Sequence, residues 1–262
     1  MGESLPLLEI AALAVGACFA GAMNAIAGGG TIITFPLLIA FGMPAIQANA
    51  TSTVALTVGI FGSVYGYRQN LPAAKPWIKL FGSVSIVGGL FGAWLLTVTS
   101  ERFFNDLVPF LILFATVLFL LGNVLNRLAG FDALEMTTHF AKRFTAAAAQ
   151  FAVAVYGGYF GAGIGILMLA SLGFMGFEDL HQMNALKNVL GSLINLVAAV
   201  WFVGSGLIDW PKMAVMTGGA VVGYYLGAHY SQRFSQAQMR GLVAVVGFGI
   251  SLKLFYDQWA AA

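Results

Sequence analysis

Lys187 has the clearest potential for chemistry, because it lies about one turn inside an apolar segment that begins near Asn184. An ammonium group in a membrane span costs a few kcal/mol on insertion scales and usually faces a pathway or a partner. The alternative is that the long side chain reaches the membrane interface from a helix end. Asn188 follows directly, so a cation stands beside amide donors. This combination favours the binding of a small anion.

Two glycine-rich breaks interrupt apolar sequence, one in each half of the chain. The first is Gly28-Gly29-Gly30-Thr31, and the second runs from Gly161 to Gly165. A helix that restarts after such a break exposes unpaired backbone N–H groups and the positive end of its dipole, which attract anions. The alternative is that the glycines only permit a sharp turn or close packing. The first break is not a nucleotide-binding loop, because no Gly-Lys-Ser/Thr follows it.

Further polar side chains accompany the two breaks. In hydrocarbon, irregular backbone and clustered polar groups persist only where they are buried in protein or line a cavity. We therefore expect one substrate site built from both halves. The candidate substrate-binding residues are Asn24, Gly28, Gly29, Gly30, Thr31, Asn49, Thr51, Ser52, Gly161, Gly163, Gly165, Asn184, Lys187 and Asn188.

The remaining reactive residues indicate neither a metal site nor catalysis. Cys18 is the only cysteine, and His139 and His229 have no ligand partner at metal-binding spacing. No HExxH pair and no intramembrane pair of aspartates is present, so we expect no catalytic residues, no metal and no cofactor. No carboxylate lies in the middle of an apolar segment, which leaves no obvious proton relay, although Glu9 lies near the start of the first.

The composition is that of an integral membrane protein. Of the 262 residues, 60% are hydrophobic and only 8% are charged. The net charge of +2 carries no message about nucleic acid. No hydrophilic stretch is long enough for a soluble domain. We therefore predict an all-α polytopic protein that forms a single membrane domain over residues 1–262, surrounded by the lipid bilayer.

Apolar runs of about 20 residues predict transmembrane helices. About eight such helices are expected, together with two short half-helices that follow the breaks. The predicted spans are Leu5–Ala27, Asn49–Tyr67, Trp77–Leu96, Leu107–Val124, Phe144–Phe160, Asn184–Val203, Trp210–Ala228 and Gly241–Phe255, and the half-helices are Ile32–Phe41 and Ile166–Phe174.

The second half of the chain repeats the first. Gly30 and Gly165 are 135 residues apart, and at this offset Asn49 meets Asn184, Pro76 meets Pro211 and Gly88 meets Gly223. We place repeat one at about 5–125, repeat two at about 142–258 and a connecting loop at about 126–143. Glycines spaced by four residues, such as Gly88 and Gly92 or Gly219, Gly223 and Gly227, are expected to allow close helix packing.

Positive charge places the connecting loop and the loop Arg68–Lys79 on the cytoplasmic side. The orientation of the two repeats stays open. Re-entrant half-helices give four crossings in each repeat, parallel repeats and cytoplasmic termini. Half-helices that cross give five crossings, inverted repeats and termini outside.

The residues at the breaks carry a family resemblance. The run GAMNAIAGGGTIITFPLLIAFGMPAIQANATSTVAL and its copy GGYFGAGIGILMLASLGFMGFEDLHQMNALKNVLGSLIN resemble the sulfite exporter TauE/SafE family of membrane transporters, over about Leu7–Phe255. This resemblance implies a bacterial inner-membrane transporter for small sulfur-containing anions such as sulfite, sulfonates and sulfoacetate. The second copy departs from the pattern, because Gly161, Gly163 and Gly165 alternate instead of forming a triplet.

We therefore expect a secondary carrier or facilitator whose partner is a small sulfur oxyanion. The alternative is a transporter or channel for another small anion, such as a carboxylate. The direction of transport, proton coupling and the oligomeric state do not follow from the sequence.

Overall fold

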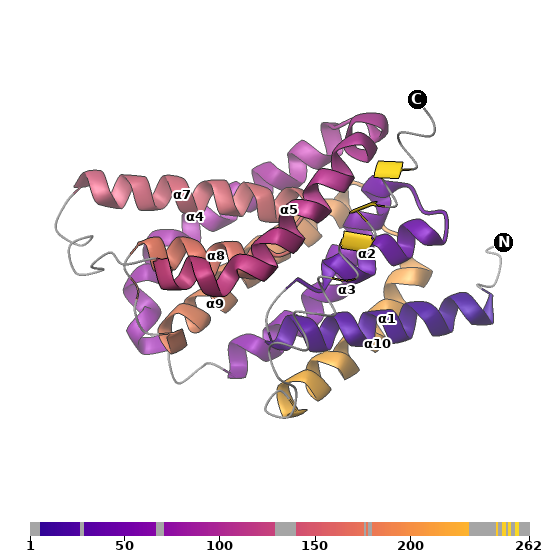
Figure 1. Ribbon diagram of the computed structural model, residues 1–262, viewed down its shortest axis with the longest axis horizontal. Coiled ribbons are helices and arrows are strands. Elements are labelled where there is room, and N and C mark those ends of the chain that lie inside the picture. Colours follow the sequence, from indigo (N-terminus) through magenta and orange to yellow (C-terminus); the bar gives the residue numbers. More distant parts are fainter. Residues whose placement is uncertain are drawn as a thin grey trace.

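The computed structural model describes residues 6–26, 29–66, 71–128, 140–175, 177 and 180–230, together with 245, 248, 249, 251, 252, 255 and 256. The regular structure in these ranges is helical (Figure 1), which confirms the predicted all-α class for this part of the chain. The helices are α1 (Leu7–Ile26), α2 (Thr31–Ala40), α3 (Ala45–Gly66), α4 (Leu71–Val98), α5 (Glu101–Leu128), α7 (Phe140–Tyr159), α8 (Ile164–Phe174), α9 (Leu180–Gly204) and α10 (Trp210–Tyr230).

Three of the described helices are long and apolar enough to cross a membrane, over Leu7–Ala25, Trp77–Val98 and Gln182–Gly204. Two shorter apolar helices cover Thr31–Ala40 and Ile164–Gly173. These two match the predicted half-helices in position and length. The remaining long helices contain more polar or charged residues, which lowers their mean hydropathy.

Several helices begin before the predicted spans. α3 begins at Ala45, where the Glu101 carboxylate accepts hydrogen bonds from the N–H groups of Ala45 and Ile46. A carboxylate at this position stabilises the unpaired N–H groups of a first turn. Hydropathy placed the start of this span at Asn49. It could not show the earlier start, because the stabilising carboxylate, Glu101, lies far away in the sequence at the start of α5.

The connecting loop is shorter than predicted. α5 extends to Leu128 and α7 begins at Phe140, so the ends of the expected loop 126–143 are helical. Arg127 and Arg143 lie beyond the apolar runs, and hydropathy therefore assigned them to the loop although the helices continue past those runs. The predicted last span, Gly241–Phe255, lies largely outside the described residues.

Each half-helix returns along the helix that precedes it. A Cβ at Gly30 would lie 2.6 Å from the carbonyl oxygen of Ala20, and Gly16 lies against the side chain of Leu37, so α2 runs antiparallel to α1. Gly29 supplies the turn with a φ of +100°. In the second break Gly161 and Gly163 have φ of +75° and +72°, a conformation that favours glycine. α8 then folds back beside Gly157 of α7.

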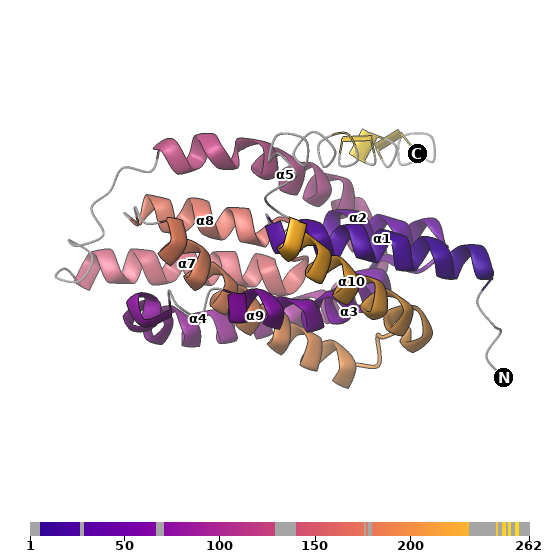
Figure 2. The same ribbon diagram turned by 90° about the horizontal axis from the view of Figure 1, so that it is seen from below.

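Glycines allow two pairs of helices to pack with their backbones in contact. Gly219, Gly223 and Gly227 of α10 lie against the backbone of α1 at Ala14, Cys18 and Ala22. Gly88 and Gly92 of α4 lie in the same way against Phe151 and Val155 of α7. Both pairs lie side by side in Figures 1 and 2. The predicted packing role of these glycines is confirmed.

α1 with α2 forms the first helical hairpin, and α7 with α8 forms the second. The tips of these two hairpins point toward each other. At one end of the molecule, here called the Glu9 end, Glu9 of α1 pairs with Lys212 of α10 at 2.7 Å. At the opposite end, the Trp77 end, the rings of Trp77 and Phe177 lie 4.9 Å apart. α1 begins at the Glu9 end, whereas α7 runs parallel to α4 and begins at the Trp77 end. Their tips therefore meet inside the molecule, beside the contact between α3 and α9.

Candidate substrate-binding site

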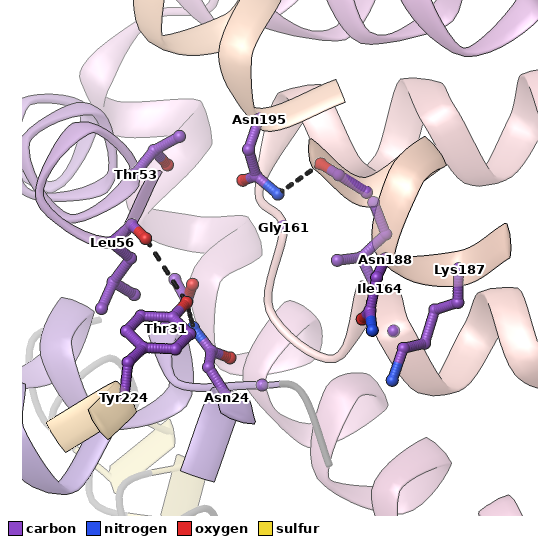
Figure 3. Close-up of a pocket in the computed structure, with 13 residues that line it drawn as sticks. Asn24, Thr31, Thr53, Leu56, Gly161, Ile164, Lys187, Asn188, Asn195 and Tyr224 are labelled. Carbon is purple, nitrogen blue, oxygen red and sulfur yellow. Dashed lines mark hydrogen bonds between the residues drawn. The ribbon is translucent and has the colours of Figure 1, made fainter. Parts of the chain in front are cut away.

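A cavity of about 70 Å³ lies where the two hairpin tips meet α3, α9 and α10. One water needs roughly 10–15 Å³ of such space, so the cavity has room for a small anion. Figure 3 shows Asn24, Thr31 and Tyr224 on one side and Lys187 and Asn188 on the other, with the Gly161 segment between them.

Seven of the predicted site residues line this cavity. They come from both halves of the chain, as the sequence analysis expected. They are Asn24, Gly29, Thr31, Gly161, Gly165, Lys187 and Asn188. Gly28 lies outside the described residues.

The predicted residues on α3 lie in contacts between helices. Asn49 donates its amide N–H to the carbonyl of Tyr159 at 2.9 Å. The hydroxyl of Ser52 lies 2.6 Å from that of Thr34, and the Thr51 hydroxyl accepts the N–H of Asp209 at 3.2 Å. These three side chains are fully or almost fully buried and do not line the cavity.

Asn184, Gly30 and Gly163 do not line the cavity but contact or adjoin residues that do. Asn184 accepts a hydrogen bond from Lys187 Nζ at 3.0 Å. Gly30 donates its N–H to Asn24 Oδ1 at 2.6 Å, and Gly163 is the left-handed residue that starts α8.

Six lining residues were missing from the predicted set. They are Thr53, Leu56, Ile164, Gly191, Asn195 and Tyr224. The 135-residue offset pairs Thr53 with the predicted Asn188 and Ile164 with the predicted Gly29, so the internal similarity could have located these two. Tyr224 carried no such signal.

Of the described residues that line the cavity, Lys187 alone is charged. Only 8% of it is exposed. In the described part of the chain its ammonium group forms no ion pair, and its hydrogen bond goes to the neutral amide of Asn184. Lys212, by contrast, is neutralised by Glu9 at 2.7 Å. A buried cation without a counter-ion is costly, and an anion in the cavity would relieve that cost.

The first turns of both half-helices face the same cavity. Thr31 is the first residue of α2 and Gly165 the second residue of α8, and both line it. N–H groups in a first helical turn have no partner within the helix. The positive ends of both helix dipoles and Lys187 therefore surround one small volume.

A layer of buried aromatic residues lies between the cavity and the Glu9 end. Phe35 follows Thr31 by one turn of α2, and Phe160 directly precedes Gly161. The ring centroids of Phe35 and Phe160 are 5.3 Å apart, and Phe104 lies 6.3 Å from each. None of the three is more than 1% exposed, so solvent does not reach these rings.

Comparison with known proteins identifies relatives among membrane transporters. A family model described as Sulfite exporter TauE/SafE matches residues 13–254. The chain is 29% identical over 239 residues to a probable membrane transporter protein of Haemophilus influenzae, with 90% of each chain covered. It is 28% identical over 243 residues to the probable membrane transporter protein YfcA of Escherichia coli K12, covering 92% of this chain and 87% of the relative.

A third relative is the probable membrane transporter protein ORF9 of a Sinorhizobium species, 27% identical over 267 residues, with 97% of this chain and 95% of the relative covered. No solved structure matches. The apolar helices and these relatives identify a multi-pass protein of the bacterial inner membrane. With the family model matching nearly the whole chain, the protein belongs to the sulfite exporter TauE/SafE family of membrane transporters.

Proposed function

We propose that this protein transports small sulfur oxyanions, such as sulfite or sulfonates, and binds them in the cavity between the two hairpin tips. The observation that carries the proposal is Lys187, a buried cation that lines the cavity and has no counter-ion among the described residues. The family's description supports the sulfur oxyanion as the substrate class.

Neutral donors complete the proposed site. The backbone N–H groups of Thr31 and Gly165 and the amide of Asn188 supply hydrogen bonds to the anion's oxygens. Hydrogen bonds between donors and an ionised acceptor are about twice as strong as neutral ones. Gly29 and Gly161 provide close backbone approach. Lys187 supplies the neutralising charge.

We further propose that the chain forms one membrane domain of two inverted repeats. At the 135-residue offset α1 to α4 correspond in order to α7 to α10. The packing partners exchange accordingly, since α1 packs on α10 while α7 packs on α4. The first hairpin begins at the Glu9 end and the second at the Trp77 end. Each hairpin enters the membrane and returns to the side from which it came. In repeat one, α3, α4 and α5 then make three full crossings. Because three is an odd number, repeat two begins on the opposite side and is inverted.

The proposed orientation places the Trp77 end in the cytoplasm. Lys75 and Lys79 lie at the start of α4, which begins at that end, and cytoplasmic segments carry an excess of positive charge. The Glu9 end, with the start of α1, then faces outward.

The two sides of the cavity differ in the size of the side chains that lie there, and this difference suggests how access could alternate between the two sides of the membrane. Phe35 and Phe160 close the Glu9 side of the cavity, whereas the residues at the corresponding positions of the other repeat are Ala170 and Ala25. We propose that the described conformation exchanges substrate with the cytoplasm, and that separation of the aromatic layer opens the outer side. Movement of one repeat against the other would accomplish this.

Flux into proteoliposomes tests the proposed substrate class. Labelled sulfite uptake should be saturable, competed by sulfonates and sulfoacetate, and indifferent to acetate. Equal competition by acetate would instead favour a general carrier of small anions. No saturable flux of any sulfur oxyanion would contradict the proposal.

A further inference from the structure

A short chain of hydrogen bonds ties the first break to α3 and α10. Asn24 of α1 accepts the N–H of Gly30 at 2.6 Å and donates to the hydroxyl of Tyr224 at 3.0 Å. That hydroxyl lies 3.3 Å from the carbonyl oxygen of Leu56, to which it donates. The two bonds on the Tyr224 side are visible in Figure 3. Both the oxygen and the nitrogen of the Asn24 amide are therefore engaged inside the protein.

The ring of Tyr224 is held independently of its hydroxyl. A Cβ at Gly59 of α3 would overlap this ring, so the missing side chain of Gly59 creates the space that the ring fills. Tyr224 is 7% exposed. Close packing on this scale fixes a side chain's position, so removal of the hydroxyl leaves the ring in place.

The second break is held in a different way. At the 135-residue offset Gly59 and Tyr224 correspond to Ile194 and Gly89, so the large and small residues are exchanged between the helices. A Cβ at Gly89 would lie 3.2 Å from Ile194 Cγ2, which is the equivalent contact without a hydroxyl. Instead, Tyr156 of α7 donates to the carbonyl of Ala162 at 2.7 Å. The first break is thus bonded through Tyr224 to a helix from the other half of the chain. The second break is bonded by Tyr156 within its own hairpin, and Asn49 of α3 binds the end of α7 just before it.

We propose that Tyr224 and Asn24 are positioning residues for the substrate site. Asn24 satisfies the N–H of Gly30, which fixes the backbone so that Thr31, one residue later, presents its first-turn N–H to the cavity. Tyr224 fixes the Asn24 amide by a hydrogen bond, so the position of α10 influences the backbone of the first break. This inference rests on the proposed anion site, but neither side chain has to touch the anion.

The test compares Tyr224→Phe with Tyr225→Phe in purified full-length protein. The control removes a hydroxyl from the next residue, which is 68% exposed on the outer surface. Sulfite Kd and thermal stability are measured for both variants. One neutral hydrogen bond corresponds to about a two- to tenfold change in an equilibrium. Tyr224→Phe should raise Kd by that factor and also lower thermal stability, because a buried hydrogen bond is lost. Tyr225→Phe should leave Kd unchanged.

A double-mutant cycle separates positioning from direct contact. If Tyr224 acts through Asn24, Tyr224→Phe has little further effect on Kd in the Asn24→Ala background. Effects that multiply would overturn the inference and assign Tyr224 to direct contact with the anion. An unchanged Kd in Tyr224→Phe would overturn it as well.

Hydrogen exchange provides a readout that needs no ligand. Amide exchange in the peptide that covers residues 29–31 should become faster in Tyr224→Phe than in wild type, and should not change in Tyr225→Phe. If wild type binds no sulfur oxyanion, the proposed function fails, and this measurement still decides the positioning role. Identical exchange in all three proteins would contradict it.

Discussion

Gly29 and Gly163 lie against each other at the tips of the two hairpins, where a Cβ at Gly29 would be 3.8 Å from both the Cα and the N of Gly163. These glycines belong to different halves of the chain, so the geometry of the cavity depends on both tips together. Both have a positive φ, so a side chain at either position would strain the backbone.

Gly163→Ala should weaken anion binding as well as stability. Its φ of +72° disfavours a side chain by about 1–2 kcal/mol, and the new Cβ would lie 3.4 Å from Ala115. Gly42→Ala is the matched control, because Gly42 has a φ of +77° with no atom within 4 Å of an added Cβ. Both variants should unfold at lower temperature in detergent. Only Gly163→Ala should also raise the sulfite Kd, and an equal effect on Kd in both variants would refute a role for this tip.

Lys187→Met should strongly reduce saturable flux while the protein still folds. Methionine retains the length of the apolar side chain but removes the charge. A charge-assisted hydrogen bond contributes roughly 1.5–3 kcal/mol, so the anion affinity should fall about 10- to 100-fold. Lys79→Met removes the same charge from an exposed position of α4. Flux measured in proteoliposomes should be normal for Lys79→Met, and undiminished flux in Lys187→Met would remove this residue from the site.

Gly223→Ala should destabilise the pair formed by α1 and α10. Its Cβ would overlap the carbonyl oxygen of Cys18, which is backbone and cannot rotate away. Overpacking of this kind costs about 1–3 kcal/mol. Gly218→Ala on the same helix meets no atom within 4 Å and should be neutral or slightly stabilising. Thermal unfolding in detergent distinguishes the two, and equal melting temperatures would contradict the close packing.

Cysteine labelling should place Lys75 and Ser205 on opposite sides of the membrane. Both positions are exposed, near the start of α4 and after the end of α9. In a Cys18→Ala background, an impermeant thiol reagent should reach Ser205→Cys from outside and Lys75→Cys only after the cytoplasmic face is opened. The proposed inverted arrangement also places Leu7, at the start of α1, outside. Labelling of a cysteine at Leu7 from the cytoplasmic side would contradict it.

The breaks and half-helices could be predicted from sequence because their signals are local. Glycines that end an apolar run, followed by about ten apolar residues, left few alternatives for 31–40 and 164–174. Lys187 and Asn188 were found by the same reasoning, since a charge inside an apolar run is conspicuous. The proposed inverted orientation of the repeats did not follow from the sequence, because apolar length alone counts the helix before each break as a complete crossing.

The side chains on α3 show where sequence reasoning ends. Asn49, Thr51 and Ser52 are polar residues in an apolar helix, and such residues serve either a site or hydrogen bonds between helices. The choice depends on how the helix is rotated against its neighbours. In the structure Thr53 and Leu56 line the cavity. Asn49 and Ser52 bond to other helices, and Thr51 bonds to Asp209 just before α10. Tyr224 was missed for the same reason, because the packing of α10 beside α1 is a tertiary contact.

The central claim is that a sulfur oxyanion binds beside Lys187. Isothermal titration of purified wild-type protein and of Lys187→Met with sulfite, thiosulfate, sulfoacetate, taurine and acetate tests it most directly. The account predicts saturable binding of sulfite or another sulfur oxyanion to wild type, no binding of acetate, and loss of binding in Lys187→Met. Sulfur oxyanion binding of equal strength in the two proteins would contradict it.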